Sequence, residues 1–98
     1  MGKEVADMAS PQPIQDMQHT KALGRHIQGR ALEHGWDTQA QMGSALGLSQ
    51  GTVGNYLADP DKIRIGSLRK MIRKFRLSPE VVLLALGYTQ SEINRIGK

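Results

Sequence analysis

The stretch Thr38–Leu57, TQAQMGSALGLSQGTVGNYL, decides how this chain folds. Its first residue and Gln41, three positions later, have the spacing of a capping box, in which a hydroxyl and an amide side chain satisfy the free amides at a helix start. Gly47 is placed to end that helix, because glycine enters the left-handed conformation without the steric cost that other residues meet. Ser49 is a favourable N-cap for a second helix. The stretch therefore predicts two short helices joined by a glycine turn.

The apolar residues of the stretch agree with this interpretation. The first helix, residues 38–46, is expected to bury Met42, Ala45 and Leu46. The second helix, residues 49–58, is expected to turn Val53, Tyr56 and Leu57 inward. The turn residue Leu48 should enter the same core. Polar or small residues are left on the outer face of the second helix: Gln50, Gly51, Thr52 and Asn55.

Helical periodicity also precedes this pair. Residues 20–34 predict a helix that starts at Thr20 and ends before Gly35. The apolar face of this helix is expected to contain Ala22, Leu23, Ile27, Ala31 and Leu32. Residues 1–19 contain two prolines and several glutamines but no apolar periodicity, so we expect them to form a flexible N-terminal arm. Simple disorder and contact with a partner are both compatible with such an arm.

Two further helices are predicted after Asp59-Pro60-Asp61, which should end the second helix of the pair. The first covers residues 65–75 and has an apolar stripe made of Leu68, Met71, Ile72 and Phe75. The second starts at Ser78-Pro79-Glu80, which combines a hydroxyl N-cap, a proline at the first helical position and an acid in the first turn. Its body, residues 81–86, is almost wholly apolar and is either fully buried or shared between core and partner. The tail, residues 89–98, is expected to contain at most one helical turn.

Composition limits the classes of protein. The chain has 98 residues, enough for one small domain, and no cysteine, which excludes disulfides and thiolate metal sites. The three histidines have no metal-ligand spacing, and no Gly-rich phosphate loop or catalytic triad is recognisable. We therefore expect no enzyme activity, no catalytic residue, no metal and no cofactor. No apolar run approaches the roughly 20 residues of a membrane span, and no secretory signal is evident, so we expect a soluble cytoplasmic protein.

Charge is distributed unevenly. The formal net charge is +4, yet Lys62–Arg76 contains seven basic residues and no acid. Such a block favours a polyanionic partner. Lys62 and Arg64 lie just beyond the second helix of the pair, where they are placed to contact phosphates. The cations of residues 69–74 lie opposite an apolar stripe, which favours an ordinary solvated helix face, although they could still add long-range attraction to a polyanion.

One set of positions can be compared with known families: Gln39, Gly47, Leu48, Ser49, Val53 and the pair Tyr56-Leu57. The later segment Leu68–Glu80, LRKMIRKFRLSPE, continues the set. Together they resemble the lambda-repressor-like helix-turn-helix family of phage repressors, Cro proteins and XRE-type regulators. The resemblance covers about residues 20–88.

The resemblance implies an all-α, compact five-helix domain over residues 20–88 that places the helix 49–58 in the major groove of DNA. The base-reading positions it implies are Gln50, Gly51, Thr52 and Asn55. The DNA-backbone contacts it implies are Gln39, Ser49, Lys62 and Arg64. The homodimer surface it implies, on the fifth helix, consists of Val82, Leu83, Leu86 and Tyr88.

Two positions depart from the family pattern. Gly43 stands where relatives usually have alanine, and Gly51 stands where many relatives have a base-reading side chain. Fewer direct base contacts would transfer part of the specificity to DNA shape.

Two functions are compatible with these patterns. The first is a sequence-specific double-stranded DNA-binding transcriptional regulator, a repressor of phage or mobile-element type that binds its operator as a dimer. The second is a protein-interaction module, such as an antitoxin or adaptor, that uses the apolar helix 79–86. The salt dependence of DNA binding separates them, because only contacts to phosphates release counterions.

Overall fold

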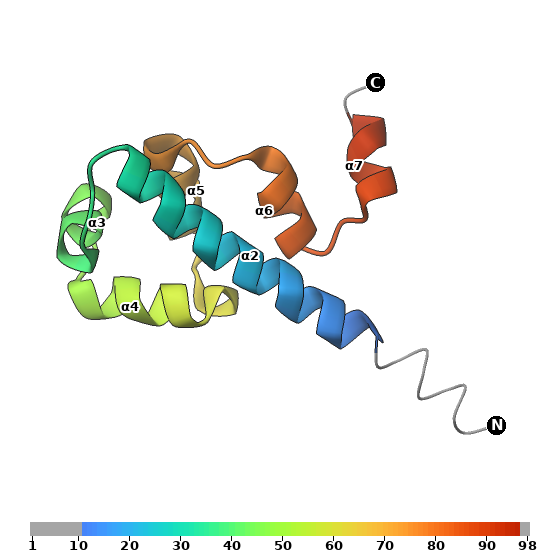
Figure 1. The fold of residues 1–98 in the computed structure, drawn as a ribbon, viewed down its shortest axis with the longest axis horizontal. Coiled ribbons are helices and arrows are strands. Elements are labelled where there is room, and N and C mark those ends of the chain that lie inside the picture. The colour runs from blue at the N-terminus through green and yellow to red at the C-terminus, as the bar shows by residue number, and fades with distance from the viewer. Residues whose placement is uncertain (1–10, 97–98) are drawn as a thin grey trace.

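The computed structural model describes the backbone of residues 11–96 and the side chains of residues 18–96. In this range the chain forms six α-helices, one 3-10 helix and no strand. The elements in chain order are α2 (Pro11–Glu33), α3 (Gln39–Leu46), α4 (Gln50–Ala58), η1 (Pro60–Lys62), α5 (Ile65–Phe75), α6 (Pro79–Ala85) and α7 (Gln90–Ile96). The prediction of an all-α fold is confirmed, but the described chain has six α-helices rather than five (Figure 1).

The start of the first helix differs from the sequence prediction. α2 begins at Pro11, so residues 11–19 are helical rather than part of an arm; the rest of the predicted arm, residues 1–10, lies outside the described residues. Pro11 and Pro13 both fall in the first helical turn, where the backbone amides have no intrahelical acceptor and proline is tolerated. The prolines therefore mark a helix start, although in the sequence they resemble helix breakers.

Thr20 is consequently an interior residue of α2 and not its cap. Its side chain is buried, and its hydroxyl donates a 3.3 Å hydrogen bond to Asp61 Oδ1. The predicted apolar face is narrower than expected: Leu23, Ile27 and Ala31 are buried, whereas Leu32 lies beyond the edge of the face and is 59% exposed. Helices α3 to α6 lie around the C-terminal half of α2, and its N-terminal end extends away from them (Figure 1).

The predicted ends of α3 and α4 are confirmed. Thr38 and Gln41 form the capping box, and Gly47 has the left-handed conformation, with φ of 72°. Ser49 caps α4, because its hydroxyl oxygen accepts a 3.1 Å hydrogen bond from the Thr52 amide. α3 and α4 pack against each other, and α4 also packs against α2.

The core is built from one face of each helix from α2 to α6. Its buried apolar residues are Leu23, Ile27, Ala31, Met42, Leu46, Val53, Tyr56, Leu68, Met71, Phe75, Leu77 and Val82. The predicted stripe of α5 is therefore confirmed except at Ile72, which is 38% exposed. Trp36 packs at the edge of this core, with its ring centroid 5.1 Å from that of Phe75.

α7 is longer than the single turn expected for the tail. Thr89 and Glu92 account for its start: the Glu92 carboxylate accepts hydrogen bonds from the Thr89 amide at 2.9 Å and hydroxyl at 3.1 Å, and the Thr89 hydroxyl oxygen accepts from the Glu92 amide. These bonds to Thr89 hold the pKa of the Glu92 carboxyl below its ordinary value. α7 packs only lightly on α6 and buries none of its residues (Figure 1).

Candidate nucleic-acid interface

The turn between α3 and α4 is tightly packed. The Leu48 amide donates a 2.8 Å hydrogen bond to the carbonyl of Gly43, which is itself buried. A Cβ atom on Gly43 would lie 2.5 Å from the carbonyl oxygen of Leu48. This close approach of two backbone segments gives a physical reason for glycine at a position where the resembled family usually has alanine. The turn fixes how α4 leaves α3, and hence which face of α4 is exposed.

The outer face of α4 carries short side chains. Val53 and Tyr56 point into the core, and Leu57 is half-buried. Since successive residues of an α-helix are about 100° apart, the opposite arc contains Gln50, Gly51, Gly54, Asn55 and Ala58. Two amide side chains, Gln50 and Asn55, therefore flank a strip of glycine and alanine. Gly54 and Ala58 were not among the residues singled out in the sequence, although their i, i+4 spacing from Gln50 places them on its side of the helix.

Gln39 joins this face from α3. A Cβ atom on Gly54 would lie 3.0 Å from Gln39 Oε1, so the Gln39 amide rests over the glycine in the middle of α4. The structure thus brings Gln39 beside the face that contains Gln50 and Asn55. The glycine is what allows this approach, because a larger residue would displace the amide.

Ser49 and Thr52 are partly occupied with each other. Their hydroxyl oxygens lie 2.8 Å apart, and Ser49 also accepts the Thr52 amide. Thr52 is half-buried and lies beyond Asn55 at the edge of the outer face. The structure therefore groups Gln50, Gly51 and Asn55 as predicted but leaves Thr52 as a supporting residue at the helix start.

The N-terminus of α4 is exposed at the same face. Gln50 and Gly51 are exposed, and their backbone amides lie in the first turn, where a helix has no internal acceptors. Such amides, together with the helix dipole, favour an anion. A Cβ atom added to Gly51 would have no neighbour within 4 Å, so a ligand can approach the backbone closely at this residue.

The predicted phosphate-contacting cations occupy two different places. Lys62 is exposed in η1, which packs against α4 directly after the outer face ends. Arg64 is exposed two residues later, at the N-cap of α5, and makes no capping hydrogen bond. Within residues 18–96 the one ion pair is Arg30–Glu33, so neither cation is neutralised by a described carboxylate.

The basic side chains of α5 have two roles: most are only exposed to solvent, and one also bonds to a backbone carbonyl. Arg69, Arg73 and Lys74 are exposed. Lys70 Nζ donates to the Leu46 carbonyl at 3.4 Å and so satisfies an acceptor at the end of α3. The opposite end of α5 is stabilised by Arg30, whose Nε donates to the carbonyls of Phe75 and Arg76 at 3.2 and 3.1 Å.

The predicted dimer surface on α6 needs correction. Val82 is 5% exposed and belongs to the core, so it is not available to a partner. Leu83 is half-buried, while Leu86 and Tyr88 are 54% and 47% exposed. The helix is thus divided between core and surface, with its exposed apolar residues at its C-terminal end.

Metal-binding and membrane-spanning features are not found in the part of the chain that the structure describes. Among these residues, no group of three or more His, Asp or Glu side chains is placed to hold a metal ion. No described helix combines the length and the apolar character needed to cross a bilayer.

Comparisons with known proteins add no relative: no family model, no curated protein and no solved structure matches this chain. The resemblance to the lambda-repressor-like family therefore rests on the residues of the helix-turn-helix and of the segment Leu68–Glu80 alone.

Proposed function

We propose that this protein is a sequence-specific double-stranded DNA-binding regulator, of repressor type, that inserts α4 into the major groove. The outer face of α4 carries this proposal. It presents two amide side chains, a strip without bulky groups and an exposed helix N-terminus on an element held rigidly by the glycine turn.

The chemistry of these groups suits base edges. A glutamine or asparagine amide has a donor beside an acceptor and pairs bidentately with adenine, which is worth about 1–3 kcal/mol of discrimination. Gln50 would read a base at the N-terminal end of α4, and Asn55 would read a second one further along. Gly51 and Ala58 would let the helix lie deep in the groove, with Ala58 offering a methyl contact to thymine.

Backbone contacts would set the orientation of α4. The free amides at its start would hold one phosphate, and Lys62 would hold another beyond its end. Gln39 would contact the edge of the groove beside Gly54. Because the glycine strip provides no base-reading side chains, DNA shape would contribute to specificity.

The test begins with selection of bound duplexes from a random pool, followed by affinity measurements on the enriched site. Gln50→Ala should weaken binding to that site by about 10-fold or more and relax one base position. Gln28→Ala is the matched control, because Gln28 is an exposed glutamine on α2, outside both α4 and α7. Equal affinities of the two variants would refute the assignment of α4 as the reading helix.

Lys62→Ala tests the backbone contact separately. It should weaken binding to all duplexes alike and lower the slope of log affinity against log salt by about one. If the protein binds DNA in a salt-dependent way but enriches no particular sequence, it is a non-specific DNA binder.

A second candidate is a protein-interaction module, favoured by the exposed apolar residues Leu86 and Tyr88 at the end of α6. A partner bound there would be retained at high salt, because burial of apolar surface is not screened by ions. Failure to select any DNA by a folded protein would favour this candidate.

A further inference from the structure

Four of the large exposed apolar side chains lie in or just beyond one cavity. Six such residues are exposed in the described chain: Leu32, Ile65, Ile72, Leu86, Tyr88 and Ile96. Ile65 and Leu86 line the same cavity, and Tyr88 and Ile96 belong to the segment that leaves it. Clustered exposed apolar groups mark an interaction surface more often than isolated ones do.

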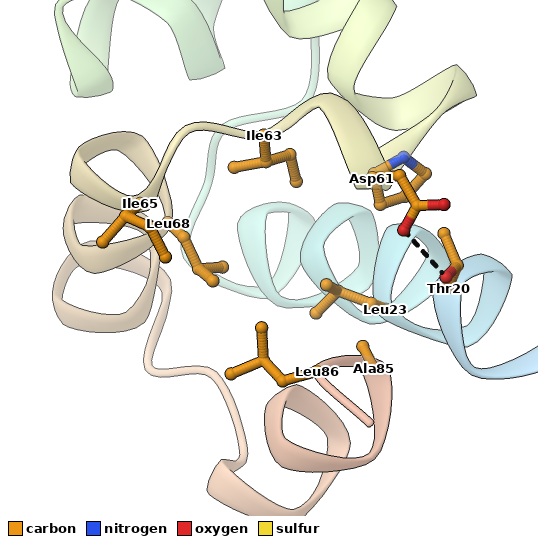
Figure 2. A pocket seen from close by; sticks show the side chains of 9 residues that line it. Thr20, Leu23, Asp61, Ile63, Ile65, Leu68, Ala85 and Leu86 are labelled. Atoms are coloured by element: carbon orange, nitrogen blue, oxygen red, sulfur yellow. Dashed lines mark hydrogen bonds between the residues drawn. The ribbon is translucent and has the colours of Figure 1, made fainter. Parts of the chain in front are cut away.

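The cavity lies between α2, η1, α5 and α6 and is open to solvent. Figure 2 shows Leu23, Ile63, Ile65, Leu68 and Leu86 around its apolar part. The hydrogen bond between Thr20 and Asp61 forms its polar end (Figure 2). Its volume of about 100 Å³ is smaller than the roughly 150 Å³ apolar cavity that holds a benzene molecule. It therefore has room for one branched aliphatic side chain.

Among the described residues, α7 has little tertiary support beyond its light packing on α6. It has seven residues, buries none of them and carries Ile96 at 64% exposure. Helices this short are unstable in water unless they pack against something. The capping interactions of Thr89 and Glu92 favour the helix but do not supply a surface for Ile96.

The end of α6 directs α7 away from its own cavity. Gly87 has a φ of 110°, its amide donates to Leu84 at 3.1 Å, and the Tyr88 amide donates to Leu83 at 3.0 Å. These two bonds form a Schellman motif, which fixes the path of the chain beyond the helix. In Figure 1, α7 accordingly stands apart from the bundle.

We propose that α7 docks into the cavity of a second copy of this chain, with Ile96 inserted among the apolar side chains and Arg95 paired with Asp61 at the polar end. The occupant has the matching chemistry: one exposed branched aliphatic residue beside one cation. Asp61 is exposed and forms no ion pair within its own described chain, so it is free to meet the arginine.

The placement of the two parts favours a reciprocal exchange. Leu86 lines the cavity, and α7 starts only four residues later, so both lie near the same point of the surface. A two-fold axis near Tyr88 would therefore let each α7, about 10 Å long, reach the other copy, in the self-complementary arrangement of two-fold dimers. α4 lies on the other side of α2 from α7 (Figure 1), and no residue of α4 lines the cavity that the exchanged helix would occupy.

The first test measures self-association of the full chain, without DNA, by sedimentation over a range of concentrations. The parent chain should dimerise. Ile96→Asp should raise the dimer dissociation constant by about 100-fold or more, because the two-fold repeats the lost apolar contact. Leu32→Asp is the control, since Leu32 is similarly exposed but lies outside the cavity. A chain that stays monomeric, or a dimer equally stable with Ile96→Asp, would overturn the proposal.

A charge exchange tests the polar end. Arg95→Glu and Asp61→Lys should each weaken the dimer, and the double variant should recover most of the loss. Helical circular dichroism checks that each variant is folded. Absence of recovery in the double variant would exclude the Arg95–Asp61 pair.

Engineered cysteines distinguish exchange from folding back, and the cysteine-free chain has no competing thiol. Ile65→Cys and Ile96→Cys, prepared separately, mixed and mildly oxidised, should form a disulfide between the two chains. The double variant on one chain, oxidised in dilute solution, should give little cross-link within the chain. An efficient link within one chain would refute exchange. Because these assays contain no DNA, their outcome is independent of the proposed DNA binding.

Discussion

The α3–α4 pair and the α6–α7 pair share the same local features, a helix cap and a glycine turn, but they differ in how much they pack against the core. Each second helix is capped by a hydroxyl, and each pair is joined through a glycine with positive φ, 72° at Gly47 and 110° at Gly87. α3 and α4 both send apolar residues into the core, whereas α7 buries none. The comparison shows that caps and glycine turns are enough to define where two helices begin and end, but that only burial of apolar side chains holds the pair against the rest of the domain.

The largest expected difference between the pairs is the effect of deleting an aliphatic side chain. Leu46→Ala in α3 should lower the free energy of unfolding by about 2–5 kcal/mol, because Leu46 is 2% exposed and a cavity would remain. Ile96→Ala in α7 should change it by less than about 0.5 kcal/mol in dilute solution. Urea unfolding of both variants measures the contrast. A large loss from Ile96→Ala under these conditions would mean that α7 is packed within its own chain.

The next difference concerns two glycines of the α3–α4 pair. Gly43→Ala should destabilise the protein by about 1 kcal/mol or more, because the new Cβ would meet the Leu48 carbonyl oxygen in a fully packed turn. Gly51→Ala should stabilise it by up to about 1 kcal/mol, since alanine favours the helix and the position is open. Thermal unfolding compares the two. Stabilisation by Gly43→Ala would show that the turn relaxes and accepts the alanine typical of the resembled family.

Removing the N-cap residue of one helix in each pair should have a smaller effect on stability, and only the pair that is packed into the core should show it. Thr38→Ala should cost about 1 kcal/mol of global stability, since α3 is part of the core. In dilute solution, where the chain is monomeric, Thr89→Ala should leave the unfolding transition unchanged and only speed hydrogen exchange of the α7 amides, because α7 can open locally. A similar fall in melting temperature for both variants would show that α7 belongs to the cooperative unit.

The smallest expected effect is a pH dependence at the start of α6. The Ser78 amide donates a 2.8 Å hydrogen bond to His26 Nε2, which requires a neutral ring. Burial, with a contribution from Arg30, lowers the pKa of His26 below its ordinary 6.5, and Glu33 opposes this in part. The associated stability is therefore complete above about pH 6.5 and declines as the pH falls through the lowered pKa.

Hydrogen exchange measured between pH 7.5 and 5 should show this decline first in α6, with the α3–α4 pair less affected. His26→Gln, which retains an acceptor but does not titrate, should remove the pH dependence. If the variant and the parent lose stability in parallel, another group is responsible.

The sequence predicted elements whose signals are local. Thr38, Ser49 and Gly47 act within a few residues of themselves, so their caps and turn could be located before any tertiary contact was known. The apolar spacing of α5 likewise identified Leu68, Met71 and Phe75 as core residues. The polar face of α4 followed from the same periodicity, which is why Gln50 and Asn55 were placed together correctly.

Other features were decided by the tertiary structure alone, because they depend on contacts between distant segments. The link from Thr20 to Asp61 spans 41 positions, and the Gly43–Leu48 approach depends on how the turn packs. Val82 and Leu86 are both apolar residues of one short segment, yet one is buried and the other exposed, because the position of α2 determines which side of α6 is covered. Short-range hydrogen bonding fixed the helices, and packing between them fixed which surfaces remain free to bind.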